Sequence, residues 1–194
     1  RPNEIVCILI PMLWDINNFK EKIKWLIASY GKISVSLILF SIPILIQMWY
    51  WKKGTNSWLY YSYQNPGEGF DFLSPYTKQF LFSFRKGWFV YTPIALIAML
   101  SLFQVFKKNK SIFWAILIPT ILSIYIVSSW SCWWYAGGSY SQRAILSIYP
   151  LLAISLGYGI TYLFTKFNVI SWLAFSFMLW LNLFQTWQFK YDII

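Results

Sequence analysis

Long apolar segments alternate with short charged segments along the chain. Five segments contain no Asp, Glu, Lys or Arg, and each is at least 19 residues long. These segments are 33–51, 88–106, 112–130, 144–164 and 167–189. Because an α-helix rises about 1.5 Å per residue, such a segment covers the hydrocarbon thickness of a bilayer, which is roughly 30 Å. The pattern therefore predicts an all-α fold, a polytopic bundle of five transmembrane helices.

A weaker apolar segment, 5–14, contains Pro11 and predicts a short N-terminal helix beside the five spans. The chain begins at Arg1 rather than Met, so we expect it to be the C-terminal part of a longer protein. The whole of 1–194 is predicted to form one transmembrane domain. Prolines are expected inside four of the spans, at Pro43, Pro93, Pro119 and Pro150. A packed bundle tolerates such prolines when neighbouring helices bind the freed carbonyl groups.

The composition excludes a soluble enzyme. Hydrophobic residues make up 58% of the chain and charged residues only 11%, whereas soluble domains have roughly 25% charged residues. The chain has no histidine for acid–base catalysis or for metal or haem ligation, and its two cysteines are too few for a disulfide framework or a Cys-rich zinc site. In so apolar a chain, the net charge of +10 favours contact with anionic lipid rather than nucleic acid.

The basic residues divide equally between the two sides of the predicted bundle. Eight lie in three short connections: Lys20, Lys22, Lys24, Lys32, Lys107, Lys108, Lys110 and Lys166. The other eight are spread over longer segments and the termini: Arg1, Lys52, Lys53, Lys78, Arg85, Lys86, Arg143 and Lys190. Because the positive-inside rule is read on short loops, the denser set is predicted to be cytoplasmic. The outer face then carries the loop 52–87, in which an interfacial helix can form, and the loop 131–143.

Aromatic residues concentrate at the predicted outer ends of the spans. Eight of the thirteen Trp residues lie there, namely Trp49, Trp51, Trp58, Trp88, Trp130, Trp133, Trp134 and Trp187. Such rings are typical of an aromatic belt at the headgroup layer. A belt forms at both interfaces, however, so the excess on one side also suits a surface that binds sugar rings. The sequence leaves both interpretations open.

Two outer boundaries of the predicted spans share a pattern. Lys86, preceded by Arg85, is seven residues before Pro93, and Arg143 is seven residues before Pro150. Both spans begin on the outer side, so each directs unpaired backbone N–H groups and the positive end of its dipole there. A guanidinium or ammonium group added to such an end makes a phosphate site. The alternative is snorkelling, in which a basic residue only caps a span.

Glu68 lies between Gly67 and Gly69 in the outer loop, in a turn that also contains Asp71. A carboxylate among basic residues at a membrane surface can be a sugar ligand, a metal ligand or a general base. An ordinary solvated turn has the same composition. Both interpretations stay open for Glu68.

Three stretches of the chain resemble motifs of a known family: RPN at 1–3, LFSFRKGWFVYTP at 81–93 and WWYAGGSYSQR at 133–143. They are similar to motifs of the polytopic GT-C glycosyltransferases, especially the bacterial members related to the protein O-mannosyltransferases and the aminoarabinose transferases (glycosyltransferase family 39). The resemblance extends over essentially the whole chain. It implies a GT-C-like fold in the bacterial inner membrane.

The resemblance also implies a reaction. The donor would be a sugar on a polyprenyl phosphate in the outer leaflet, and a hydroxyl of a sugar, protein or lipid acceptor would attack the anomeric carbon with inversion. Arg143, Arg85 and Lys86 would then stabilise the charge that develops on the leaving lipid phosphate. The residues expected to contact the substrate are Glu68, Trp133, Trp134, Tyr135, Tyr140 and Gln142.

The catalytic base is expected to lie outside this chain. In the family the acidic base occupies the first outer loop, which places it upstream of residue 1. The chain alone is therefore expected to be inactive, and Glu68 inherits no role as the base. Family members sometimes use a divalent metal, but no residue of this chain is assigned as a metal ligand.

Two other classes of membrane protein fit the same features. A transporter or flippase for a lipid-linked anion would need polar residues at the midplane and an inverted repeat, and the predicted spans contain no ionisable Asp, Glu, Lys or Arg. An O-antigen ligase or polymerase would also use outer-face arginines on a lipid-linked sugar. An acidic residue in the loop upstream of residue 1 would favour the glycosyltransferase.

Overall fold

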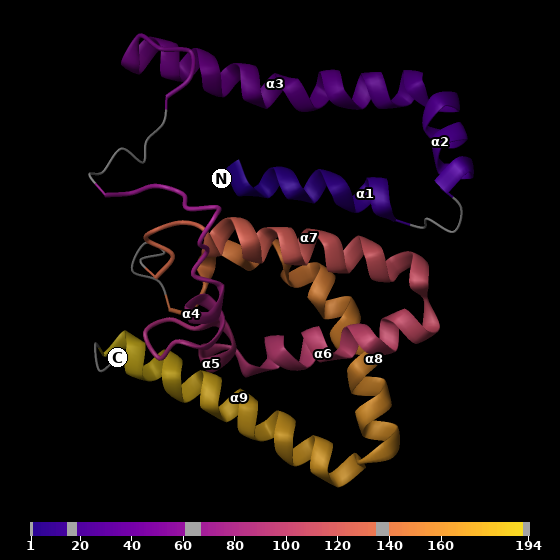
Figure 1. Ribbon diagram of the computed structural model, residues 1–194, viewed down its shortest axis with the longest axis vertical. Helices are drawn as coiled ribbons and strands as arrows, with labels where there is room; N and C mark the ends of the chain where they lie inside the picture. The colour runs from indigo at the N-terminus through magenta and orange to yellow at the C-terminus, as the bar shows by residue number, and fades with distance from the viewer. Residues whose placement is uncertain (1, 15–18, 61–66, 135–139, 192–194) are drawn as a thin grey trace. The chain divides into compact units, whose positions relative to one another are not determined.

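The computed structural model describes residues 2–14, 19–60, 67–134 and 140–191. Within these ranges the regular structure is helical, and the one β-type pairing is an isolated bridge between Phe70 and Trp130. The predicted all-α class is confirmed (Figure 1). Four helical segments of the described ranges are long and apolar enough to cross a membrane: α3 (Tyr30–Thr55), α7 (Lys110–Ser128), the 3-10 helix η3 (Arg143–Ile148) with α8 (Tyr149–Lys166), and α9 (Asn168–Lys190).

The predicted span 88–106 is divided by a break in the helix. It consists of the four-residue α5 (Trp88–Tyr91) and the 16-residue α6 (Pro93–Lys108). Between them Thr92 leaves the helical conformation, with φ −139° and ψ 67°. Pro93 has no backbone N–H and so cannot continue the hydrogen bonding of α5. The count of five full spans therefore remains a prediction.

The remaining prolines behave in two ways. Pro150 lies in the first turn of α8, where a missing N–H costs no hydrogen bond. Pro43 and Pro119 lie inside α3 and α7, as expected from the sequence. The N-terminal apolar segment is also helical, as the 3-10 helix η1 (Pro2–Ile8) followed by α1 (Leu9–Leu13).

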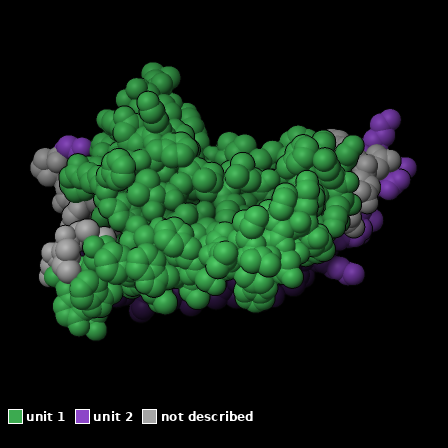
Figure 2. Space-filling model, turned by 90° about the horizontal axis from the view of Figure 1, so that it is seen from below, with its two compact units in different colours: residues 1–15, 69–194 green, residues 16–68 purple. Residues whose placement is uncertain are grey.

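The chain separates into two compact units, which Figure 2 colours green and purple. Unit 1 comprises Arg1–Asp15 and Gly69–Ile194, and unit 2 comprises Ile16–Glu68. Unit 2 contains α2 (Phe19–Ala28) and α3, and α3 extends to Thr55, past the predicted start of the outer loop 52–87. A short helix, α4 (Thr77–Phe82), forms within that loop in unit 1. The single domain stays a prediction.

Small side chains bring α6 and α8 close together in unit 1. The Ser155 hydroxyl donates to the Ala98 carbonyl across the interface at 2.8 Å. A Cβ atom at Gly159 would overlap the side chain of Ser101. Small residues are the usual means by which helices approach closely in a membrane, because burial of apolar surface gives little driving force in lipid.

The connections of unit 1 gather at its two ends. Figure 1 shows the turn between α6 and α7 and the turn between α8 and α9 on one side, and α4, α5 and the C-terminal end of α9 on the other. Two backbone hydrogen bonds join the segment 69–77 to the end of α7. They run from Asp71 N to Ser129 O (2.7 Å) and from Tyr76 N to Ser128 O (2.8 Å). The described parts of both predicted outer loops in unit 1 therefore lie at the same end.

Candidate functional site

The two boundary motifs found in the sequence lie side by side in unit 1. Hydrogen bonds join residues 86–92 to residues 140–149, and the bonded residues are 49 to 61 positions apart in the sequence. The bonds run from Gln142 Nε2 to Lys86 O (2.6 Å), between the Thr92 and Ser141 hydroxyls (2.9 Å), from Tyr140 Oη to Tyr91 O (2.9 Å), and from Trp88 Nε1 to Tyr149 Oη (3.1 Å). The structure thus brings the Arg85–Lys86 segment next to the segment that ends at Arg143.

The break at Pro93 supplies one of these acceptors. In a continuous helix the Tyr91 carbonyl would bind the N–H of Ala95, but that N–H bonds to Thr92 O at 2.9 Å. The Tyr91 carbonyl instead accepts from the Tyr140 phenol and from Asn182 Nδ2 at 3.3 Å. The helix break leaves this carbonyl without its usual donor, and the loop before η3 and the middle of α9 both donate to it instead.

A tight turn holds Arg85 and Lys86 in place. The Gly87 N–H donates to Ser83 O at 2.6 Å, and the Arg85 N–H donates to the Ser83 hydroxyl at 3.0 Å. A Cβ atom at Gly87 would collide with backbone atoms of Ser83 and Phe82. Only glycine fits there, because the atoms in the way are main chain and cannot rotate aside.

The segment before Arg143 contains a strained residue. Ser141 has a φ of 54°, a left-handed conformation that costs a residue with a Cβ roughly 1–2 kcal/mol. Its side chain is buried and bonds to Thr92, which compensates part of this cost. Strain of this kind clusters at functional sites, where surrounding contacts hold a residue in an unfavourable conformation.

A cavity of about 340 Å³ opens where these segments meet. Eight residues line it: Thr92, Tyr140, Ser141, Gln142, Arg143, Leu146, Tyr149 and Asn182. Hydroxyl, phenol and amide groups come from four different helices or loops, and Leu146 supplies an apolar wall. Such a mixture of polar groups on an apolar frame is typical of a small-molecule site.

Gln142 lines the cavity and carries a buried acceptor that bonds to no described residue. The residue is 1% exposed, and its Nε2 is bound to Lys86 O. Its Oε1 is buried and has no hydrogen-bond partner among the described residues. Leaving a buried acceptor unpaired costs roughly 1–3 kcal/mol.

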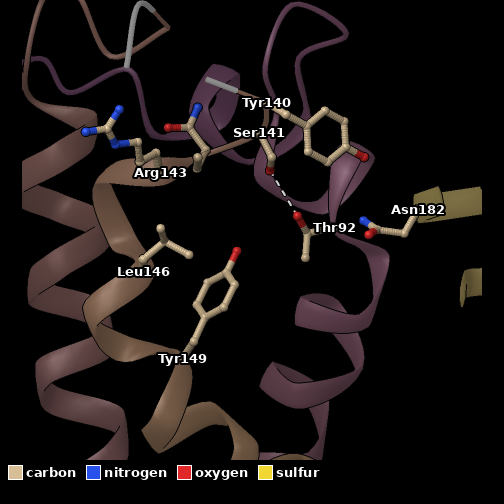
Figure 3. A pocket seen from close by; sticks show the side chains of 8 residues that line it. Thr92, Tyr140, Ser141, Arg143, Leu146, Tyr149 and Asn182 are labelled. Atoms are coloured by element: carbon tan, nitrogen blue, oxygen red, sulfur yellow. Dashed lines mark hydrogen bonds between the residues drawn. The ribbon is translucent and has the colours of Figure 1, made fainter. Parts of the chain in front are cut away.

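Arg143 is the only one of the three predicted phosphate-binding residues that lines the cavity. The Arg143 side chain is exposed. Figure 3 shows its guanidinium directed away from Thr92 and Asn182, with the Tyr149 hydroxyl between Arg143 and Thr92 in this view. The polar groups of the cavity and the guanidinium are therefore separate. They could contact two different parts of one elongated molecule.

Arg85 and Trp134 contact each other instead of the cavity. The Arg85 guanidinium carbon lies 3.5 Å from the centroid of the Trp134 ring, within the range of a cation–π interaction. Arg85 is nevertheless exposed. Arg85 was predicted to bind the lipid phosphate and Trp134 to contact the substrate, and the structure gives these two residues a mutual contact.

Burial and the neighbouring Arg85 charge both lower the pKa of Lys86 from the ordinary value of 10.5. A lysine is charged only below its pKa. Its attraction for an anion is therefore lost at a lower pH here than at an exposed lysine. The pKa of Tyr140 is raised to about 12, mainly by burial and further by Tyr91 and Tyr149, so this phenol stays a neutral hydrogen-bond donor at physiological pH.

The lowered pKa of Lys86 predicts a pH dependence. Affinity for a lipid phosphate is expected to fall as the pH rises through the alkaline range below 10.5, because the ammonium loses its proton. Lys86→Arg keeps the charge at every accessible pH and should remove this fall. Titrating the binding of a short-chain prenyl phosphate to both proteins in detergent measures the effect. An identical pH profile for the two proteins would rule out Lys86 as the titrating group.

The other predicted contacts are distributed differently. Trp133 is 6% exposed and packs edge-on against Phe80 in the core of unit 1, with ring centroids 6.4 Å apart, so its indole belongs to the core and not to the cavity lining. Tyr140 and Gln142 do line the cavity. Tyr135 lies outside the described residues. Glu68 ends unit 2, and its role as a substrate contact stays a prediction.

Sequence reasoning missed four residues of the cavity wall, namely Thr92, Leu146, Tyr149 and Asn182. Thr92 directly precedes Pro93 and Tyr149 directly precedes Pro150, the two prolines of the repeated pattern. This shared position could have marked both residues as candidates for the site. Asn182 is polar within an apolar helix and lies three residues before Gln185, on the same helical face. Gln185 Oε1 is 2.7 Å from the Tyr140 hydroxyl, so this polar face marks where α9 meets the site. Leu146 had no signal.

Comparison of the chain with family models, curated proteins and solved structures gives no match. The site is consequently interpreted from its own chemistry. Among the described residues no three Cys, Asp or Glu side chains come together as a metal site, so these residues offer no ligand set for the divalent metal that the family resemblance allows.

Proposed function

We propose that the protein is a glycosyltransferase of the bacterial inner membrane that transfers a sugar from a polyprenyl phosphate to an acceptor hydroxyl on the outer face. The single observation that carries the proposal is the pairing of the Arg85–Lys86 segment with the Gln142–Arg143 segment beside one cavity. A sugar on a lipid phosphate needs three things together: a polar pocket, a cationic group and access from the membrane.

The cavity supports the sugar half of the proposal. Its walls present the hydroxyls of Thr92, Ser141 and Tyr149 and the amides of Asn182 and Gln142. A sugar ring carries several hydroxyl groups that both donate and accept, and these match the hydroxyl and amide groups of the walls. The volume of about 340 Å³ is within the range of ligand pockets.

The basic residues support the phosphate half. Arg143 lines the cavity. The residue before it, Gln142, donates a hydrogen bond to the backbone carbonyl of Lys86. A guanidinium binds phosphate oxygens in a bidentate manner, and the Lys86 ammonium adds a charge on a flexible stem. The lipid tail of the donor would leave the site toward the apolar exposed surfaces of the helices.

The proposed reaction is an inverting substitution at the anomeric carbon. The acceptor oxygen forms a bond to that carbon as the bond from the carbon to the phosphate oxygen breaks, and the electron pair leaves with the polyprenyl phosphate. A general base, a role to which no described residue is assigned, would take the acceptor proton. Fixed cations near the leaving oxygen stabilise the charge that grows there and so lower the barrier.

The test uses membranes from cells that express the protein. We expect labelled sugar to move from a polyprenyl-phosphate donor to an acceptor, with inversion at the anomeric carbon. Movement of the intact labelled lipid between leaflets without transfer would replace the proposal by a flippase. Transfer that requires a whole glycan on a pyrophosphate lipid would replace it by a ligase or polymerase.

A further inference from the structure

The helix α2 has an amphipathic surface that the proposed reaction does not use. It contains three lysines and one acidic residue in ten positions, FKEKIKWLIA. At about 100° of rotation per residue, Ile23, Leu26 and Ile27 fall on one side of the helix. Lys20 and Lys22 fall at the two borders of that apolar side.

The apolar side of α2 is open within unit 2. Ile23 and Ile27 are both exposed, Ile27 to 68%. Trp25 is also exposed, and the Lys22 ammonium lies 5.0 Å from the centroid of its ring. Lysines that border an apolar side are the combination that interfacial helices use, because the stems lie along the acyl chains while the charges reach the headgroups. Trp25 lies on the other side of the helix and is not part of this apolar side.

The junction with α3 shows why α2 does not simply extend the membrane span. A helix of ten residues is about 15 Å long, half of the hydrocarbon thickness. The backbone bends at Ser29, where φ is −99° and ψ is 13°. Helical hydrogen bonds still cross this bend, from Ser29 N to Trp25 O at 2.9 Å and from Ile33 N to Ser29 O at 3.0 Å. Figure 1 shows α2 turning sharply away from the axis of α3. When α3 spans a bilayer, α2 is therefore directed along its surface.

Charge decides what this surface binds. Lys20, Lys22 and Lys24 outnumber the single carboxylate of Glu21, and Lys32 follows in the first turns of α3. The inner leaflet of a cell membrane is negatively charged and attracts basic segments by roughly 1 kcal/mol for each Lys near its surface. An apolar side bordered by lysines matches that leaflet in both polarity and charge.

We propose that α2 is an interfacial helix that binds anionic phospholipid headgroups of the cytoplasmic leaflet. The inference is independent of glycosyl transfer. Ile23, Leu26 and Ile27 enter the acyl boundary, and Lys20, Lys22 and Lys24 contact the lipid phosphates. In this position α2 sets the depth and the register at which α3 enters the bilayer.

Hydrogen exchange of the full-length protein in nanodiscs tests this proposal. The α2 amides are expected to exchange roughly tenfold more slowly when about a third of the lipids are phosphatidylglycerol than in pure phosphatidylcholine. Replacing Lys20, Lys22 and Lys24 by Gln should abolish that difference, whereas replacement by Arg should preserve it because the charge is kept. The Arg variant also shows that a change in α2 itself does not unfold the helix.

A matched control uses the other lysine cluster. Lys107 and Lys108 end α6, and Lys110 begins α7. Replacing these three lysines by Gln removes the same amount of charge and should leave the hydrogen exchange of the α2 amides unchanged. Equal exchange of α2 in both kinds of nanodisc would overturn the proposal and indicate that protein, and not lipid, covers the helix. If the Gln replacements in the two lysine clusters reduced the exchange protection of α2 equally, the assignment of lipid binding to α2 would be overturned.

Discussion

Replacing Arg143 by alanine is expected to lower the rate of sugar transfer by roughly 100-fold, which corresponds to about 2.7 kcal/mol of transition-state stabilisation. The guanidinium stands at the edge of the cavity, where the leaving phosphate would develop its charge. The loss should appear mainly in kcat, because the charge on the bridging oxygen grows as the bond to the sugar breaks. Arg143→Lys should restore part of the rate, since an ammonium keeps the charge but not the bidentate geometry.

Lys190→Ala is the matched control for this prediction. Lys190 is another basic residue of unit 1 and ends α9, where its ammonium lies over the ring of Tyr191. A basic residue at the end of an apolar helix can simply snorkel to the headgroups, and Lys190 does not line the cavity. Initial rates with a labelled polyprenyl-phosphate sugar should be nearly unchanged in this control. Normal transfer by Arg143→Ala would remove Arg143 from the proposed phosphate site.

Gly87→Ala is expected to have the second large effect, because the added Cβ would collide with the main chain of Ser83. The turn must open, and overpacking of this kind costs roughly 1–3 kcal/mol. We expect an apparent unfolding temperature about 5 °C lower in detergent. Transfer should also fall more than roughly tenfold, since a displacement of about 1 Å in a site is costly. Opening the turn shifts Lys86 O away from Gln142.

Gly157→Ala separates this effect from a general cost of adding a methyl group. Gly157 lies in α8, and nothing is within 4 Å of the position of its added Cβ. Alanine also has a higher helix propensity than glycine, so this variant should match or exceed the parent in stability and activity. A Gly87→Ala protein with the parent unfolding temperature and rate would show that the turn does not position the site.

The described helices could largely be predicted from the sequence, because helix formation and membrane length depend on local composition. The charge-free segments 33–51, 112–130 and 167–189 correspond to α3, α7 and α9 with small shifts at their ends. The segment 88–106 differed because composition carries no information on hydrogen bonding around Pro93. The missing N–H moves the start of α6 to Pro93 itself.

The candidate site could be predicted only in part. The repeated spacing of a basic residue and a proline marked two segments that the structure joins by hydrogen bonds, but the spacing could not show which side chains face each other. Trp133 and Trp134 are adjacent in the sequence and equivalent in composition. One packs in the core against Phe80 and the other contacts Arg85, because the backbone turns between them.

By itself, the sequence determined that this chain is helical and that its apolar segments have membrane length, since both depend on residues that are neighbours in the chain. Only the tertiary structure decided that Lys86 and Gln142 are hydrogen-bonded and that Asn182 reaches the carbonyl of Tyr91. These contacts join positions 56 and 91 residues apart. Their formation depends on how α6, α8 and α9 pack and on the need of each buried polar group for a partner, which no local pattern encodes.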